Sequence, residues 1–272
     1  MKKDDLMFTL GRAIDMRYKS NIMILGLTLM AAILGWIFTG EGVLGLYLGG
    51  GVFLSWALAR ELDPAHALSA FVVAILSFST FLSTNPIQVT LIFWLLLLMR
   101  VVNRITGKKL TLVDVVSTLG FTVFLSFSRE NSLYLLLFMV AIVSLVIIGE
   151  RSMFVLISSS FTVILFLGQT IFMDSLSFIS LGELDYLTGS LLILTFLSVP
   201  LFWKLSKANI LDDLDKKVSS VRIFSSQLVY ALAIILFTLY GSLTINDQLI
   251  HLAVILGIML YHLSVRVFIF KY

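Results

Sequence analysis

The feature that most constrains this chain is the recurrence of long apolar segments along its whole length. These segments are about 15 to 20 residues long, close to what an α-helix needs to cross a hydrocarbon layer of about 30 Å, and only short polar stretches separate them. Of the 272 residues, 59% are hydrophobic and 13% are charged, whereas a soluble domain has about 25% charged residues. A soluble protein must cover its surface with polar groups. We therefore expect an all-α, polytopic transmembrane helix bundle.

Hydropathy predicts about ten membrane spans, which together form one membrane domain over residues 1–272 with no soluble domain. The expected spans are 21–38, 43–59, 65–82, 87–103, 112–128, 132–149, 153–173, 187–203, 228–243 and 248–267.

The positive-inside rule gives these spans an orientation, because Lys and Arg concentrate at the cytoplasmic ends of membrane helices. If the N-terminus is cytoplasmic, all of the 19 Lys and Arg residues except Arg129 fall on the cytoplasmic side. A missed or extra span would break this alternation from that point onward. The sequence thus predicts ten spans in a cell membrane, with the N- and C-termini both cytoplasmic. Two five-span halves of opposite orientation permit an inverted repeat, although no repeat is visible in the sequence.

Two cytoplasmic segments outside the spans have amphipathic patterns. Residues 1–20 combine apolar residues at four-residue spacing with basic residues, which is typical of a helix lying on an anionic membrane surface. Residues 204–227 are interpreted as a second interfacial helix, between spans eight and nine, because apolar residues share one face and acidic residues lie in its first turn.

Polar residues at the starts of three spans are interpreted as helix caps. Thr111 and Asp114 have the spacing of a capping box for the fifth span. Asp63 and Asn85 each precede a proline, so we expect them to cap the third and fourth spans.

Candidate binding residues concentrate at two neighbouring cytoplasmic turns, 60–66 and 100–109. Residues 100, 103 and 104 lie at i, i+3 and i+4 and would share one helix face, where two guanidinium groups could hold a phosphate or carboxylate. His262 lies in the last span and is a further candidate for substrate contact. The predicted substrate-binding residues are Arg60, Glu61, His66, Arg100, Asn103, Arg104 and His262. The simpler alternative is that these basic residues only mark topology and extend toward lipid headgroups.

Several kinds of chemistry find no support in the sequence. The chain has no cysteine, which excludes disulfides and thiolate metal sites. Glu61, Asp63 and His66 lie close together, but their spacing matches no metal-binding signature, so neither a metal nor a cofactor is predicted. No span has a charged residue near its middle, where ion-coupled carriers often place one. The net charge of +3 follows from membrane topology and does not indicate nucleic acid as a partner.

Three functions remain open. The first is a small permease or flippase for a small organic or lipid-like solute. The second is a membrane enzyme acting at the cytoplasmic interface on a phosphate-bearing lipid, with Glu61 or His66 as acid or base. The third is a non-catalytic subunit or assembly factor that binds another membrane protein through glycine faces such as Gly45 and Gly49. Expected partners are the lipid bilayer and either anionic headgroups or a small anionic or lipid-like ligand, with a homo-oligomer left open.

Overall fold

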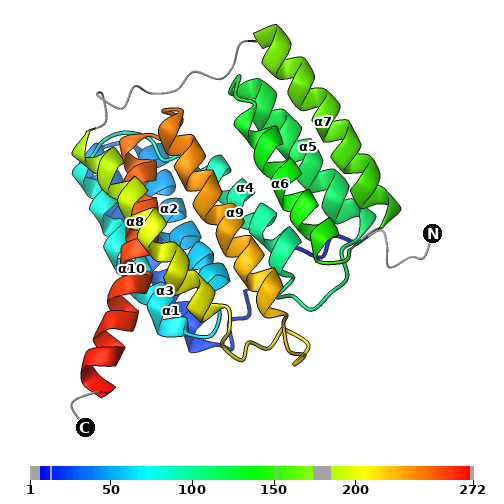
Figure 1. Ribbon diagram of the computed structural model, residues 1–272. Coiled ribbons are helices and arrows are strands. Elements are labelled where there is room, and N and C mark those ends of the chain that lie inside the picture. Colours follow the sequence, from blue (N-terminus) through cyan, green and yellow to red (C-terminus); the bar gives the residue numbers. More distant parts are fainter. Residues whose placement is uncertain (1–6, 13, 151, 174–184, 270–272) are drawn as a thin grey trace. The chain divides into compact units, whose positions relative to one another are not determined.

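The computed structural model describes residues 7–12, 14–150, 152–173 and 185–269, and Figure 1 shows its helices. Within these residues the secondary structure is ten α-helices and one six-residue 3₁₀ helix, and strands are absent. The elements are α1 Lys19–Thr39, α2 Gly42–Leu62, α3 Ala67–Leu76, η2 Ser77–Leu82, α4 Val89–Asn103, α5 Leu112–Ser128, α6 Leu133–Ile147, α7 Met153–Met173, α8 Tyr186–Leu205, α9 Ser220–Leu239 and α10 Ile245–Ile269. An α-helix or 3₁₀ helix therefore forms at each predicted span, although α9 begins eight residues before the expected start, 228.

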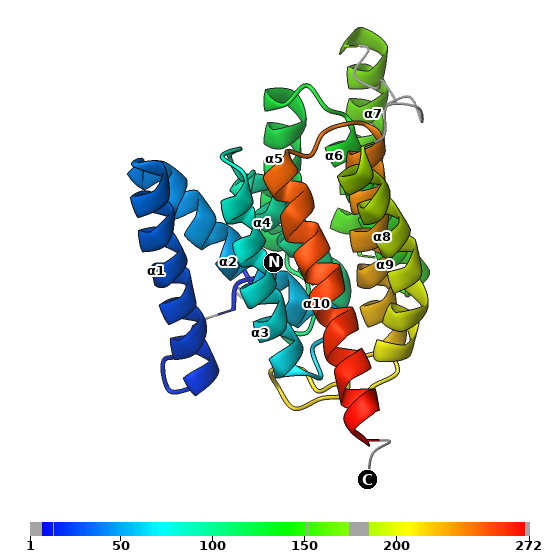
Figure 2. The ribbon, with the colours of Figure 1, turned by 90° about the vertical axis from the view of Figure 1, so that its left-hand side faces the viewer.

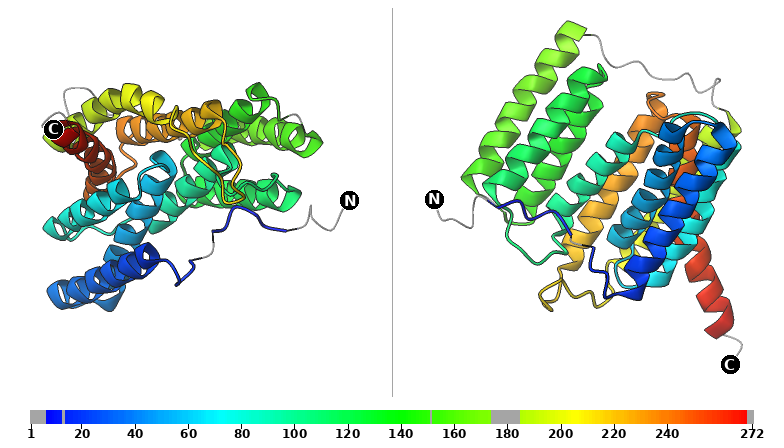
Figure 3. Two further views of the ribbon diagram at one scale, coloured as in Figure 1. Left: turned by 90° about the horizontal axis from the view of Figure 1, so that it is seen from below. Right: turned by 180° about the vertical axis from the view of Figure 1, so that it is seen from behind.

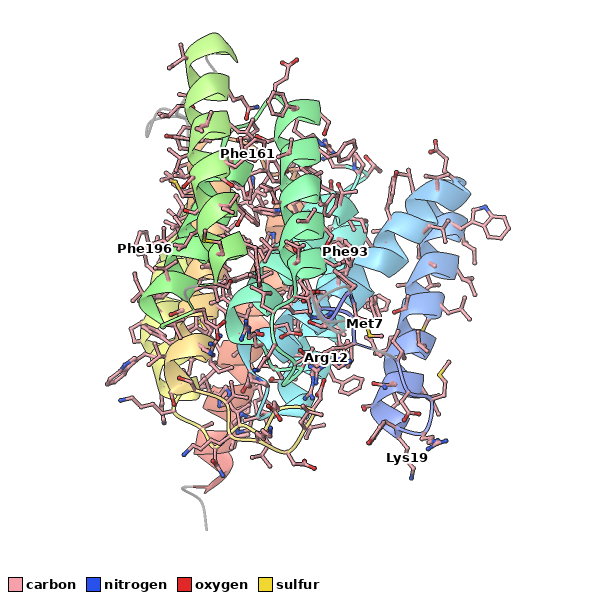
Figure 4. All side chains as sticks on the ribbon, turned by 90° about the vertical axis from the view of Figure 1, so that its right-hand side faces the viewer. Met7, Arg12, Lys19, Phe93, Phe161 and Phe196 are labelled. Carbon is pink, nitrogen blue, oxygen red and sulfur yellow. The ribbon has the colours of Figure 1, made fainter. Side chains whose placement is uncertain are left out.

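Six of the described helices are long and apolar enough to cross a membrane, namely α1, α2, α7, α8, α9 and α10. The other four apolar helices are shorter. Large apolar side chains point outward from the helices, as Phe161 and Phe196 illustrate in Figure 4. Outward-facing apolar side chains in this number suit a lipid environment and not water. The chain is thus an all-helical protein with several membrane-compatible helices, and the number of spans and their orientation stay predictions.

The helices divide into two compact units, each built from segments that are distant in the sequence. Unit 1 comprises Met1–Arg12, Trp94–Glu183 and Ser206–Gly241, and unit 2 comprises Ala13–Phe93, Leu184–Leu205 and Ser242–Tyr272. Unit 1 therefore contains most of α4 together with α5, α6, α7 and α9, while unit 2 contains α1, α2, α3, η2, α8 and α10. The expectation of one membrane domain remains untested, so each unit is described by itself.

Glycines bring α1 and α2 into close contact in unit 2, where the two helices lie side by side (Figure 2). A Cβ atom on Gly49 would lie 2.8 Å from the Thr28 carbonyl oxygen, and one on Gly35 would lie 2.6 Å from Leu48. In the same unit α10 packs against α3, with Gly257 directly against Val73. These close approaches need residues without a side chain, as in helix pairs with small-residue motifs.

An aromatic cluster is buried in unit 1. The rings of Trp94, Tyr134 and Phe237 lie with centroids 5.0 to 6.2 Å apart, and the Trp94 indole donates a 2.8 Å hydrogen bond to Thr122. Buried tryptophan usually finds such a partner. In the same unit α5, α6 and α7 run side by side (Figure 1; Figure 3, right).

The helix predicted for residues 1–20 is wrong for its described part. Residues 7–12 and 14–18 are not helical, and α1 begins only at Lys19, labelled with Met7 and Arg12 in Figure 4. The backbone of this segment bonds to the start of α5 instead, since the Thr9 amide donates to Asp114 (2.6 Å) and the Met7 carbonyl accepts from Thr111 (2.8 Å).

The interfacial helix predicted over 204–227 is also wrong. Residues 206–219 form a loop, and α9 begins at Ser220. The Asp212 carboxylate accepts hydrogen bonds from the Leu214 and Lys216 amides, and Asp215 has a left-handed φ of 58°. Aspartate side chains that bond to nearby backbone amides favour turns over helix.

The cap predictions have mixed outcomes. Thr111 and Asp114 form the expected capping box of α5. Asp63 does not cap the third span, because it is the C-terminal cap of α2. Asn85 does not cap the fourth span either, since α4 begins at Val89.

Candidate functional site

A polar cluster of unit 2 is built on the short connection between α2 and α3. Asp63 ends α2, with its amide donating to the Ala59 carbonyl at 2.8 Å. Pro64 follows, and the residue before a proline is biased away from helical geometry. His66 then precedes the first residue of α3 in an extended conformation. The turn thus places a carboxylate and an imidazole three residues apart, at the ends of two helices.

Asp63 joins this turn to α10. One carboxylate oxygen lies 2.8 Å from His66 Nδ1, and the other lies 2.9 Å from His262 Nε2 on α10. The side chain of Asp63 is 1% exposed, whereas those of His66 and His262 are 38% and 16% exposed. A buried carboxylate therefore holds two imidazoles that remain accessible from outside.

The two histidines determine the charge state of Asp63. Burial acts to raise the pKa of this carboxyl group, because it disfavours the charged form. Hydrogen bonds from His262, His66 and Ser69, together with the attraction of His66, outweigh burial, so the pKa lies below its ordinary value. Asp63 is consequently a carboxylate at neutral pH.

Aromatic contacts fix the orientation of the imidazoles. The His66 and His262 rings are 4.8 Å apart and nearly perpendicular, and Tyr261 lies 5.8 Å from His66. We call Asp63, His66 and His262 the Asp–His–His cluster. Two of its members were predicted as site residues, whereas Asp63 was interpreted as a cap and its spacing from Glu61 and His66 gave no metal-binding signature. No local signal could reveal its pairing with His262, which lies 199 residues away.

An apolar groove of about 640 Å³ lies between α1 and α3 of the same unit. Its walls are Ser20, Met23, Gly26, Leu27 and Met30 on α1, and Ala67, Leu68, Phe71 and Ile75 on α3. The groove is open at the side, since Leu68 is 65% exposed and Ile75 is 61% exposed. Its α3 wall begins at Ala67, the residue that follows His66 in the chain, and the residues that line the groove do not include Asp63, His66 or His262.

The length of this groove can be compared with a lipid leaflet. The lining residues span Ser20 to Met30 on α1 and Ala67 to Ile75 on α3, or about 12 to 15 Å at 1.5 Å per residue. The hydrocarbon core of a bilayer is about 30 Å thick. The groove therefore has the length of one leaflet's acyl layer.

The other candidate residues of unit 2 are neighbours of Asp63 in the chain. Glu61 is fully buried in the last turn of α2, and Arg60 is partly exposed. Their predicted role in substrate binding remains untested.

The three candidates of unit 1 lie at the end of α4. Arg100 donates a 3.1 Å hydrogen bond to the Leu10 carbonyl, and the buried Asn103 side chain accepts from the Ile105 amide. Arg104 lies beyond the helix with a left-handed φ of 53°. In the contacts described, Arg100 and Arg104 bond to different partners, and their predicted joint binding of an anion stays a prediction.

Arg104 belongs to a cluster of three charged side chains that the sequence did not reveal. Its guanidinium forms two 2.8 Å bonds to the Glu150 carboxylate, which also accepts a 2.5 Å bond from Arg222. The pKa of Arg104 lies below its ordinary value, mainly because burial disfavours the charged guanidinium. The nearby Arg222 also lowers this pKa, whereas Glu150 acts to raise it. Glu150 lies 46 residues from Arg104 and 72 from Arg222, so spacing could not predict the contact.

The chain was compared with protein-family models, curated proteins and solved structures. No family model, curated protein or solved structure matches it.

Proposed function

We propose that this protein spans a cell membrane ten times, with both termini cytoplasmic, and acts at the cytoplasmic interface on a lipid-like substrate. The observation that carries the proposal is the apolar groove between α1 and α3, whose α3 wall begins at the residue after His66 of the Asp–His–His cluster. The distribution of Lys and Arg supports the topology.

The groove and the cluster together match the two parts of an amphiphile. An acyl chain from the cytoplasmic leaflet would enter through the open side of the groove, and its polar head would lie at His66 and His262. The groove can hold an acyl chain at little cost in free energy, because its walls are apolar. Substrate entry from the bilayer would not require a water-filled path.

The cluster also has the elements of acid–base chemistry. An imidazole held by a carboxylate is a common general base, since the carboxylate orients the ring and stabilises its protonated form. His66 is the more exposed imidazole and is the proposed base. Arg60 and Glu61 of the same unit remain proposed contacts of the polar head, with the Arg60 guanidinium suited to a phosphate group. Arg100, Asn103 and Arg104 of unit 1 remain a separate proposal for anion binding.

Native mass spectrometry can test whether the groove holds lipid. In Gly26→Trp, the indole would fill the groove, since a Cβ on Gly26 meets no atom within 4 Å. Gly168→Trp on α7 is the matched control, because its Cβ also meets no atom within 4 Å. We expect lipid to remain bound to the wild type and to the Gly168 variant and to be lost from the Gly26 variant. Equal lipid binding by all three proteins would contradict the proposal.

A lipid flippase or permease is the second candidate, and the break in the third span favours it. The α-helix ends at Leu76 and continues as the 3₁₀ helix Ser77–Leu82. Ser77 and Thr80 are buried, and their hydroxyl groups donate to the Ala74 and Ser77 carbonyls. Discontinuous membrane helices often mark transport sites. Reconstituted protein that moves a fluorescent lipid between leaflets would favour this function over chemistry confined to one leaflet.

The third function, a subunit that binds a partner through glycine faces, would need glycines other than Gly45 and Gly49, because both of these contact α1 within unit 2.

A further inference from the structure

We propose that Asp63, His66 and His262 bind a divalent transition-metal ion of the zinc class. The inference concerns the same residues as the proposed function, but it stands on their donor atoms and does not require that the groove binds lipid. With an ion bound, His66 would be a ligand and no longer the general base, because an imidazole that coordinates through one nitrogen carries a proton on the other.

The three side chains offer a donor set that suits zinc. Each has one donor atom, a carboxylate oxygen or an imidazole nitrogen, and these atoms all lie within 4.8 Å of one another. Zinc is bound by such atoms at about 2.0 to 2.2 Å, and catalytic zinc sites commonly have three protein ligands with one position open. One carboxylate and two histidines match that pattern.

The cluster would have to rearrange to form a coordination sphere, because its donor atoms lie up to 4.8 Å apart and the two imidazoles bond to different oxygens of Asp63. The imidazole nitrogens now lie 2.8 and 2.9 Å from the carboxylate oxygens. Around a tetrahedral ion, ligand atoms lie about 3.3 Å apart, as follows from the metal–ligand distances. Asp63 is fixed at the end of α2, whereas His66 is partly exposed on a short turn.

The charges and the exposure of the cluster also suit a cation. The ionised carboxylate contributes one negative charge, and two neutral imidazoles can complete the ligand set without adding positive charge. Because His66 is the most exposed member, an open fourth position would face outward at this side. It would accept a water molecule or an oxygen atom of a phosphate or carboxylate group, whose binding the ion would strengthen.

The alternative is a cluster that only joins the α2–α3 turn to α10 through hydrogen bonds. The two alternatives differ in the side chain they require. A glutamine at position 262 can still donate a hydrogen bond to Asp63, but it is a much poorer zinc ligand than imidazole. A structural role would therefore tolerate His262→Gln, whereas metal binding would not.

Cobalt(II) is the probe, because a tetrahedral cobalt site has visible absorption bands. Purified full-length protein is stripped with chelator, dialysed and titrated with Co²⁺, and the variants are His66→Gln, His262→Gln and the double variant. His251→Gln is the matched control, because His251 is the third histidine of the chain and lies on α10 outside the cluster. We expect one Co²⁺ per chain in the wild type and in His251→Gln. Each single variant should bind at least about tenfold more weakly, as loss of a ligand predicts, and the double variant should show no tetrahedral bands.

The proposal is overturned if the wild type shows no tetrahedral cobalt bands, or if the double variant binds Co²⁺ as tightly as the wild type. Thermal unfolding identifies any variant that fails to fold. In that case His66→Gln decides the question, because His66 is partly exposed and its replacement disturbs packing least. Gly26→Trp should retain cobalt binding even where it loses lipid, so failure of the metal site and failure of the lipid-binding function are distinguishable.

Discussion

Gly45 lies directly against the backbone of α1, and a Cβ atom on it would fall 2.5 Å from the Ala32 carbonyl oxygen. A backbone atom cannot move aside as a side chain can. The α1–α2 contact therefore depends on glycine at this position.

Replacement of Gly45 by alanine should destabilise the protein by about 1 to 3 kcal/mol, the usual range for overpacking of a well-packed interface. Gly120→Ala on α5 is the matched control, because its Cβ would meet no atom within 4 Å. In the control, alanine should be neutral or stabilise the helix, since glycine costs about 0.5 to 1 kcal/mol inside a helix. Thermal unfolding in detergent compares the two variants, and equal melting temperatures would contradict the tight contact.

The N-terminal segment of unit 1 should be released when Asp114 is changed to alanine. The Asp114 carboxylate accepts bonds from the Thr9 amide and hydroxyl group, both at 2.6 Å, and from the Thr111 amide at 2.9 Å. Removal of this carboxylate leaves buried donors without an acceptor, and each such donor lowers the free energy of unfolding by about 1 to 3 kcal/mol. Trypsin should then cleave faster after Arg12, and the cleavage rate is the measurement.

Ser117→Ala is the control for this experiment, because the Ser117 hydroxyl bonds only to carbonyls of its own helix in the contacts described, those of Val113 and Asp114. Its cleavage rate should equal that of the wild type. An unchanged rate in Asp114→Ala would show that these hydrogen bonds do not hold the segment.

Local chemistry predicted the helices and some of their caps. Apolar length predicted a helical element at each of the ten spans, and the Thr111 capping box was found because its four residues are contiguous. The failure at 204–227 also has a local cause, since the Asp212 side chain bonds the Leu214 and Lys216 amides and turns the chain. The spacing of apolar residues alone cannot predict that a side chain will bond to the backbone amides in place of the helix.

The candidate sites were predictable only in part, because their contacts join distant segments. His66 stood out at a cytoplasmic turn and His262 within the last span, but their common partner Asp63 follows from how α10 packs in unit 2. Glu150 likewise joins Arg104 and Arg222 across long sequence separations. Residue type can therefore identify candidates, while pairing depends on the tertiary structure.

Glu150 should contribute more to stability than either of its arginine partners. Its side chain is 26% exposed, and it pairs with both Arg104 and Arg222. In Glu150→Gln the two guanidinium groups lose their counter-charge and repel each other, so we expect a loss of about 1 to 3 kcal/mol, as for hydrogen bonds to charged groups. Arg222→Gln should lower the free energy of unfolding by a smaller amount, because Glu150 remains paired with Arg104. Chemical denaturation of both variants and the double variant measures the coupling, and equal losses from the two single changes would contradict this ranking.

The loop of residues 104–110 should depend on Gly107 for two separate reasons, which a matched pair can distinguish. Gly107 and Gly40 have nearly equal left-handed φ values of 71° and 72°, but only Gly107 is crowded. A Cβ on Gly107 would lie 2.6 Å from the Asp212 carboxylate, whereas one on Gly40 meets no atom within 4 Å. Gly40→Ala should therefore cost only the backbone strain, about 1 to 2 kcal/mol. Gly107→Ala should cost more, because the new methyl group also pushes the Asp212 turn away from residues 104–110. Thermal unfolding measures the difference, and equal destabilisation by the two substitutions would show that the Asp212 turn moves aside at no cost.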